Sequence, residues 1–309
     1  MDQSSARSAV PAPAVGWLDR GVLFGGLAVL AFTFTVHSTR AAVLGFGDVI
    51  AGLGRTEIAA FLAVTVLLVM RVSWPTPGQL SRLVLVGLTS FGGFPYFLSL
   101  GLTTVPSVHG VVVCGLVPMS TAAFSVMMAG ERVNTLFWVG CLSGLTAVIA
   151  FAIVQGVGSI LPGDAWIFAA VFAGSLGNVE GGRLAREMAG WRVVCWALVL
   201  VAPVLAVVIG FSLSDAPLRY VHPTFSAWLG LLYASFISSF LGFIVWFRGL
   251  ALGGIARIAQ VQLMQPAFGL VASAVVLGEQ ITLSSLLTAA AIAACAGICL
   301  SNRARPHRR

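Results

Sequence analysis

The sequence predicts an all-α membrane protein of ten transmembrane helices, arranged as two inverted five-helix repeats around a central cavity. The first observation is composition. Of the 309 residues, 59% are hydrophobic and only 9% are charged, whereas a soluble domain carries about 25% charged residues. The second is a series of apolar runs, each near the ~20 residues that a bilayer span needs. The third is an internal repeat that relates the two halves of the chain.

The apolar runs are expected to be helices, because lipid cannot satisfy the polar backbone of an open strand. A porin-like barrel would instead show alternating segments of about 10 residues, and these runs are continuous and longer. The connections are short, so the function must lie inside the membrane bundle. The expected spans are 21–39, 49–70, 83–103, 108–129, 135–155, 165–184, 191–212, 226–247, 255–277 and 282–301.

Arginine placement gives the expected orientation. With the N-terminus inside, thirteen arginines fall at cytoplasmic positions and only Arg40 and Arg219 fall in outside loops. The positive-inside rule then places both termini in the cytoplasm of a multi-pass protein of the bacterial inner membrane. We expect four parts: a cytoplasmic tail at 1–20, a first five-helix repeat at 21–155, a second repeat at 165–301 and a basic cytoplasmic tail at 302–309.

Composition also excludes several chemistries. All seventeen basic side chains are arginine, so a Walker phosphate loop, a Schiff base and a lysine general base are ruled out. A membrane-embedded enzyme would need clustered aspartates, an HExxH motif or a Ser/Lys pair, and none is found, so we predict no enzyme activity. The cysteines lack metal-ligand spacing, and neither a metal nor another cofactor is expected. They are Cys114, Cys141, Cys195, Cys295 and Cys299.

An internal repeat is visible in the sequence. Residues 102–133 align without a gap to residues 250–281 at an offset of 148. Pro118 then matches Pro266, and each proline stands thirteen residues before the glutamate of a Gly-Glu pair, which ends at Glu131 in the first half. A shared proline could be chance, but the shared proline, Gly-Glu pair and apolar filling together indicate duplication.

Two weaker matches fall where a repeat predicts them. Residues 91–94 resemble residues 240–243 at an offset of 149, and residues 35–40 resemble residues 178–183 at an offset of 143. Each half therefore has five spans. Because five is odd, the second half enters the membrane from the opposite side. Such inverted repeats are a transporter architecture, since they supply two similar gates on opposite faces.

These residues resemble the drug/metabolite transporter superfamily, in its EamA-type branch with two five-helix units. The resemblance covers nearly the whole chain, and the proline thirteen residues before Gly-Glu is its most specific pattern. Arg55 also resembles an arginine that these proteins often carry in the second helix. The resemblance implies ten helices around a central cavity and both termini in the cytoplasm. It is nearest to the YddG-like amino-acid exporters, which handle aromatic residues among others.

The predicted function is therefore secondary transport. We expect export of amino acids, aromatic and other neutral ones included, or of related small metabolites, across the inner membrane by alternating access. A broad drug/metabolite exporter and a metabolite importer of the same fold remain alternatives, with a membrane-embedded enzyme as a remote one. The expected partners are a small-molecule substrate and membrane lipid, with no nucleic acid, and the chain is expected to be a monomer or weak dimer.

Matched polar residues in the first and sixth spans are the first site candidates, because polar side chains within a span are costly and often functional. Thr35 and His37 match Asn178 and Glu180, and the repeat would place the pairs on opposite sides of the midplane. His37 titrates near neutrality and a buried Glu180 could too, so either could couple transport to protons. Alternatively, His37 and Glu180 lie near helix ends, solvated and paired with Arg40 and Arg183.

The second span offers an arginine and a glutamate. A buried pair formed by Arg55 and Glu57 would neutralise itself and fix the helix. Alternatively, Arg55 anchors the carboxylate of a zwitterionic substrate or forms a gate. Arg257 in the ninth span is a further candidate for an ion pair or gate.

The ninth span carries three glutamines within six residues, which is excessive for a helix that faces lipid. Gln262 and Gln265 are three residues apart and share a helix face. They could hydrogen-bond an amino-acid backbone in a cavity, or they could bond between helices. Pro118 and Pro266 each remove a helix hydrogen bond, so we expect kinks that line the cavity and bend during gating, or else static kinks.

The remaining candidates are weaker. His109, which opens the fourth span, is expected at the outer surface, with reach into the cavity as the alternative. Glu131 and Glu279 follow glycines at helix ends and are expected to anchor loops or form interfacial pairs. Aromatic and hydroxyl side chains could form a binding wall, although packing is their commoner role. These candidates are Tyr96, Ser239 and Trp246.

Overall fold

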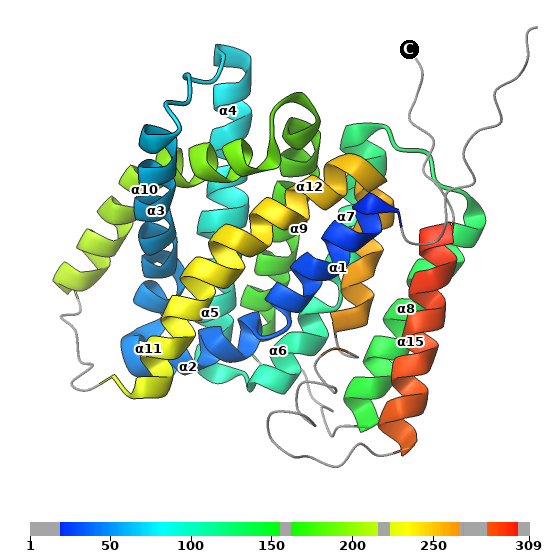
Figure 1. Ribbon diagram of the computed structural model, residues 1–309. Helices are drawn as coiled ribbons and strands as arrows, with labels where there is room; N and C mark the ends of the chain where they lie inside the picture. Colours follow the sequence, from blue (N-terminus) through cyan, green and yellow to red (C-terminus); the bar gives the residue numbers. More distant parts are fainter. Residues whose placement is uncertain (1–18, 155–161, 216–222, 266–267, 269–282, 302–309) are drawn as a thin grey trace, which may run out of the picture.

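The computed structural model describes residues 19–154, 162–215, 223–265, 268 and 283–301 (Figure 1). Every regular element within these ranges is a helix, which confirms the all-α class. The helices pack into one bundle, and most of them run between its upper and lower ends in Figure 1.

The first half runs from residue 20 to residue 154. Its helices are interrupted at two places by π-helical turns, labelled η1 and η2, where backbone hydrogen bonds reach one residue further than in an α-helix. In chain order the elements are α1 (Arg20–Phe32), α2 (Thr35–Val49), η1 (Ile50–Gly54), α3 (Arg55–Val69), α4 (Pro77–Val86), η2 (Gly87–Gly93), α5 (Phe94–Thr104), α6 (Ser107–Cys114), α7 (Val117–Ala129) and α8 (Thr135–Val154).

The second half is built in the same way. It contains a third π-helical segment, η3, and a short 3₁₀ helix, η4. In chain order its elements are α9 (Asp164–Glu187), α10 (Gly190–Asp215), α11 (Phe225–Leu232), η3 (Tyr233–Gly242), α12 (Phe243–Gly253), α13 (Ile255–Ala259), η4 (Gln260–Met264) and α15 (Leu283–Ser301).

Four helical runs among the described residues are long and apolar enough to cross a membrane. They are Arg20–Val69, Pro77–Thr104, Gly190–Ser214 and Phe225–Gly253. The first run has 50 residues, or about 75 Å at the helical rise, which exceeds twice the ~30 Å hydrocarbon core. Gly47 breaks it, because its φ of 80° and ψ of 173° are not helical. The chain turns there, and α3 climbs back beside the bundle (Figure 1). The count of ten spans stays a prediction.

The two π-helical segments η2 and η3 occupy matching positions in the repeat. Thr89–Phe94 reads TSFGGF and Ser238–Phe243 reads SSFLGF, at the offset of 149. Each segment ends at the glycine before the last phenylalanine. Because π-helical turns are rare and frequently mark functional sites, their recurrence at one repeat position indicates a shared role in both halves.

Close packing between the halves positions the centre of the bundle. Helix α1 crosses α12 at glycines: a side chain at Gly21 would lie 2.6 Å from the Gly253 backbone, and one at Gly249 would lie 2.9 Å from the Gly25 nitrogen. Further along, α2 packs on α11, where a side chain at Gly230 would lie 2.4 Å from the Ser38 carbonyl oxygen. The first helix of one half is therefore held against the third span of the other.

Candidate functional site

A cavity lies where helices of the two halves meet. It encloses about 570 Å³ of atom-free space, its open mouth included. Its lining comes from α1, α2, α5, α6 and α7 of the first half and from α9, η3, α12 and the η4 segment of the second. The lining residues are Phe32, Thr35, Val36, Phe94, Cys114, Val117, Gly174, Asn178, Ser238, Phe243, Gln262 and Gln265.

The lining follows the internal repeat. Four pairs of lining residues are equivalent under the repeat offsets: Thr35 with Asn178, Phe94 with Phe243, Cys114 with Gln262 and Val117 with Gln265. Each half thus contributes the same positions of its first, third and fourth spans. This arrangement places the cavity at the boundary between the repeats.

The two matching walls differ in polarity. In the first half the fourth-span positions are Cys114 and Val117, and in the second half they are Gln262 and Gln265. Gln265 donates its Nε2 hydrogen to the Phe32 carbonyl oxygen at 3.0 Å. The Gln262 Oε1 atom is buried and has no hydrogen-bond partner within the described part of the chain. None of the lining residues given above is charged, so a ligand would meet aromatic rings, hydroxyls and carboxamides.

Hydrogen bonds behind the lining hold its polar groups in place. The hydroxyls of Thr35 and Ser238 lie 2.9 Å apart and join α2 to η3. The indole of Trp246 donates to Asn178 Oδ1 at 2.9 Å, and Asn178 Nδ2 donates to Thr121 Oγ1 at 3.4 Å. Because both ends of the Asn178 amide have partners, its orientation in the wall is fixed.

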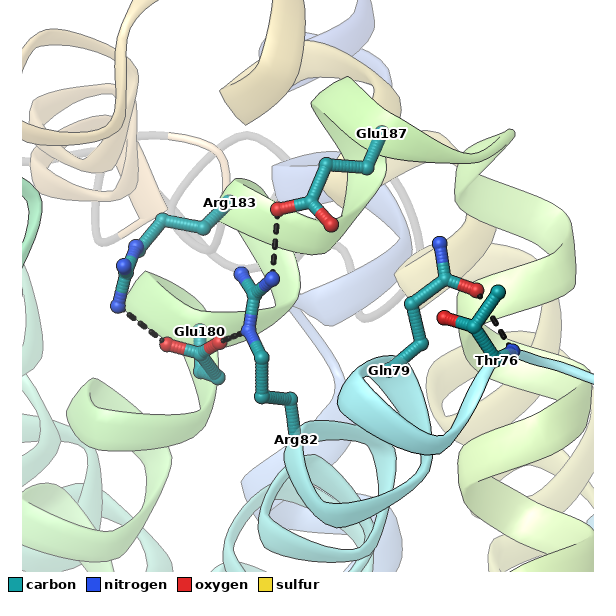
Figure 2. Close-up of polar contacts among 6 residues, drawn as sticks. All are labelled: Thr76, Gln79, Arg82, Glu180, Arg183 and Glu187. Carbon is teal, nitrogen blue, oxygen red and sulfur yellow. Dashed lines mark hydrogen bonds and ion pairs between the residues drawn. The ribbon is translucent and has the colours of Figure 1, made fainter.

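The start of α4 directs an arginine toward α9. The Thr76 backbone nitrogen donates to Gln79 Oε1 at 3.1 Å, which caps the helix. Pro77 occupies the first turn, where its missing N–H leaves no bond unmade. Arg82 follows in the next turn and extends toward α9 (Figure 2).

Arg82 joins two carboxylates of α9. Its Nε atom pairs with Glu180 Oε1, and its Nη1 atom lies 2.6 Å from Glu187 Oε1. Arg183 approaches Glu180 from the other side at 2.8 Å, so Figure 2 shows Glu180 between two guanidinium groups. Its side chain is only 3% exposed, and the two arginines compensate for the loss of water around the charge.

Glu131 fastens α7 to the start of α13. Gly130 ends α7 in the left-handed conformation, with a φ of 63°, which glycine adopts readily. The carboxylate that follows accepts hydrogen bonds from the backbone nitrogens of Ile255 and Ala256, at 2.9 and 2.7 Å. It also lies 2.6 Å from Arg186 Nη2. One buried carboxylate thus binds an α9 cation and two helix N-terminal donors.

A third ion pair closes the set. Asp19 accepts from the Val22 nitrogen at the start of α1 and lies 2.5 Å from Arg257 Nη1 of α13. We call the region formed by these contacts the ion-paired end. Each of Arg82, Glu131 and Asp19 in the first half pairs with a residue of the second half. The charges at this end therefore hold the halves together.

Comparison with known proteins identifies the family. The pattern of the EamA-like transporter family matches the chain twice, over residues 19–153 and 161–303. The chain belongs to the EamA-like transporter family. The two matches establish two repeats, and the family places the protein in the drug/metabolite transporter superfamily, with a transport role in a membrane and a small-molecule substrate.

Two further likenesses agree with the family. The EamA-like transporter is 38% identical over 266 residues to the "Uncharacterized transporter YdeK" of Bacillus subtilis (strain 168), which covers 86% of this chain and 90% of that protein. It also shares its fold with a solved protein crystal structure at a TM-score of 0.72. That match covers 90% of this chain and 97% of the other at 19% identity, so it bears on the fold alone.

Four of the residues predicted for the cavity of this EamA-like transporter lie in its lining: Thr35, Asn178, Gln262 and Gln265. Trp246 is fully buried and lies behind the wall, where it donates to Asn178. Whether any of these side chains contacts a substrate stays a prediction.

Other candidates lie outside the lining. His37 is exposed on α2, and Glu180 is engaged by Arg82 and Arg183 at the ion-paired end. Tyr96 is half-buried, with its ring 6.0 Å from that of the adjacent Phe97. Ser239 is buried beside the lining residue Ser238. The side chain of His109 lies outside the described residues.

The ion-pair and kink candidates are partly reassigned. Arg55 is 1% exposed and donates to Thr39 Oγ1 at 3.0 Å. It forms no ion pair with Glu57 among the described contacts, because residues two apart on a helix face different directions. Arg257 pairs with Asp19. Pro118 lies in the first turn of α7, after the break that separates α7 from α6, and Pro266 lies outside the described residues.

Two structurally important residues escaped the sequence reasoning: Phe32 and Arg82. Neither has a local signal, since an apolar residue and an arginine near a helix end are ordinary features of any membrane helix. Their roles depend on how the halves pack.

Proposed function

We propose that this EamA-like transporter exports neutral amino acids, aromatic ones included, or closely related metabolites across the bacterial inner membrane by alternating access. The observation that carries the proposal is the cavity at the boundary of the repeats, with uncharged walls of opposite character. An apolar side chain fits against Phe94, Cys114 and Val117. The polar end of the same molecule can bond the carboxamides of Gln262 and Gln265 opposite.

The lining and its charge support this substrate class. Small-molecule sites are mostly apolar with a few placed polar groups, and the lining of this cavity has the same character. Since the lining carries no charge, a molecule with net charge would lose its hydration without a counter-ion. An uncharged metabolite avoids this penalty, and a zwitterion has no net charge but needs hydrogen bonds from the lining to both of its charged groups.

The proposed cycle follows from the repeat. Ten spans in two inverted halves would supply two gates of similar build, with both termini in the cytoplasm. The ion pairs that join the halves involve the start of α1, the first half of α4 and the end of α7, which lie in the upper part of the bundle in Figure 1. We infer that this end is closed while the pairs persist. Opening it requires that Glu131, Asp19 and Arg82 separate from the other half.

The test is transport by the purified protein in liposomes. Labelled amino acids should enter saturably, compete within one chemical class, and lose affinity in Gln262→Ala but not in Thr65→Ala, a control at an exposed position of α3. Running the assay with and without an imposed pH gradient reports proton coupling. Sorting the vesicles by protein orientation reports export or import. If folded, monodisperse protein moves no amino acid, the amino-acid assignment is wrong and other metabolites become the candidates.

A further inference from the structure

Arg55 carries a buried charge that the described structure leaves without a counter-ion. Its side chain is 1% exposed, in the first turn of α3. The Nη1 atom donates to Thr39 Oγ1 at 3.0 Å, and the Nε atom has no partner within the described part of the chain. Among the described residues no carboxylate lies within ion-pair distance. A guanidinium has five N–H donors, so most of its binding capacity is unused.

The fold does not require this arginine. The second helix of the other half is α10, and between Val193 and Phe211 it contains no charged residue. Both halves therefore build this helix, and only the first half buries a cation in it. Since burying an unpaired charge is strongly unfavourable, a structural role alone does not account for Arg55.

The position of Arg55 relates it to the cavity. Its partner Thr39 lies four residues, or about one turn, beyond Thr35, so both threonines share a face of α2. Thr35 lines the cavity. The Arg55 guanidinium thus reaches the same face of α2 about one helical turn from the cavity wall.

A second unpaired polar atom lies in the same region. The Ser99 hydroxyl is buried without a hydrogen-bond partner among the described residues. A side chain at Gly52 would lie 3.0 Å from it, and Gly52 is about one turn before Arg55. A hydroxyl on α5 without a partner among the described residues and a cation with unused donors at the start of α3 therefore both lie close to η1.

We propose that Arg55 binds the carboxylate of the transported molecule. This inference rests on the proposed function and narrows its substrate class to molecules that carry a carboxylate. The planar guanidinium binds a carboxylate through two parallel hydrogen bonds. With the carboxylate at Arg55 and the side chain against the aromatic rings, the ammonium group faces the Gln262 carboxamide oxygen and the ring faces of the cavity.

With a zwitterion bound, the carboxylate pairs with Arg55 and the net charge of the site stays at +1. That charge then lies on the ammonium group, which an uncharged oxygen and aromatic faces stabilise. A ligand that has the amine but no carboxylate would place its positive charge near an unpaired Arg55. A ligand that has the carboxylate but no amine would still neutralise Arg55.

The experiment compares two ligands that share one ring. Purified full-length protein is titrated with 3-phenylpropionate, which has only the carboxylate, and with phenethylamine, which has only the amine. Binding is followed by thermal shift and by competition against labelled phenylalanine. We expect the wild type to prefer the carboxylate by about tenfold or more, as for a charge-assisted bond. In Arg55→Gln the carboxylate should bind at least about tenfold more weakly, while the amine binds more tightly.

These opposite shifts separate ligand binding from a general structural defect, which would weaken both ligands together. Removing an unpaired charge should also raise the melting temperature of ligand-free Arg55→Gln. Arg248→Gln, at an exposed arginine of α12, is the matched control and should leave the affinity for both ligands unchanged. Should Arg55→Gln fail to fold, Arg55→Lys keeps the cation, and we expect a weaker carboxylate preference because the two-bond geometry is lost.

Two outcomes overturn the inference. Parallel changes in the affinity for both ligands in Arg55→Gln would make Arg55 a packing residue. If that variant does not fold, an equal loss of affinity for both ligands in Arg55→Lys would lead to the same conclusion. Failure of the proposed function looks different: the wild type would not transport phenylalanine, whatever the two ligands do in the thermal-shift titration.

Discussion

At the ion-paired end, buried or half-buried charges of one half meet opposite charges of the other; in the cavity, the halves meet through hydroxyls, amides and aromatic rings. Glu131, for example, binds Arg186 and two backbone donors, whereas Thr35 and Ser238 share a single neutral hydrogen bond. Both regions join the same two halves. The two regions differ in the strength of their contacts and in how readily a ligand can replace those contacts.

This contrast fits the different tasks of the two regions. Charged contacts between halves are strong when water is excluded and weaken when water enters, so they suit a closure that breaks as a unit. Neutral groups in the cavity can exchange partners with a small ligand at little expense. A transporter needs both, because its gate must hold while the site fills and empties.

The largest effect is expected at Glu131. Glu131→Gln keeps the shape of the side chain but removes the anion, so Arg186 loses its partner and the bonds from Ile255 and Ala256 lose their charge assistance. We expect a loss of about 2–4 kcal/mol in unfolding free energy, measured by thermal unfolding in detergent, together with reduced transport in liposomes.

Glu187→Gln is the control for this prediction. Glu187 also pairs with an arginine, but its side chain is 44% exposed, and pairs of this kind contribute about 0–1 kcal/mol. Equal losses of unfolding free energy in the two variants would mean that burial and helix capping add nothing at Glu131. The contacts of the ion-paired end would then be no stronger than exposed ion pairs, and the contrast with the cavity would be lost.

The next effect concerns the polar wall of the cavity. Gln262→Leu removes an unpaired buried oxygen and makes this wall as apolar as its repeat equivalent, Cys114. We expect the apparent affinity for a neutral amino acid to fall by up to about tenfold, the equivalent of one lost hydrogen bond, with little loss of stability. Kinetics of uptake into liposomes measure it.

Cys114→Ala is the matched variant on the apolar wall and should change affinity less, because no hydrogen bond is at stake there. If the two variants lose affinity equally, the walls do not differ in function. A fall in melting temperature of Gln262→Leu would instead indicate that the carboxamide holds helices together.

Sequence reasoning reached the general design for a physical reason. Helices in lipid must be apolar over a set length, so composition and the continuous apolar runs together predicted the all-α class. The duplicated Pro-to-Gly-Glu spacing pointed to the family that the comparison then established. The same repeat singled out Thr35 with Asn178, because a polar residue inside a span is unusual and two at equivalent positions are more so.

The remaining features depend on packing between segments far apart in the chain. Nothing local in the sequence pairs Arg82 with Glu180, since they belong to different halves and meet only when α4 lies on α9. Breaks within spans were also missed: hydropathy does not distinguish an α-helix from the π-helical turns at η2 and η3. The expectation of an Arg55–Glu57 pair ignored helix geometry, because side chains two residues apart diverge.

A smaller effect is expected for the neutral bond between the halves. Thr35→Val and Ser238→Ala should each lower the unfolding free energy by about 1 kcal/mol. Each change leaves the hydroxyl of the other residue buried without its hydrogen-bond partner. The double variant should lose little more than either single one, since both changes remove the same bond. Thermal unfolding of all three measures the coupling, and full additivity would show that the 2.9 Å contact contributes nothing.

The smallest effect tests a residue that lies outside both regions. His37 is exposed on α2 and does not line the cavity, so His37→Gln should leave uptake within about 1.5-fold of the wild type, which is less than one hydrogen bond contributes. Any dependence of uptake on a pH gradient that the wild type shows should also persist. If His37→Gln instead abolished that dependence, the proton would enter along the exposed face of α2. The group that couples transport to protons would then lie outside both the ion-paired end and the cavity, and these two regions would not be sufficient to explain transport.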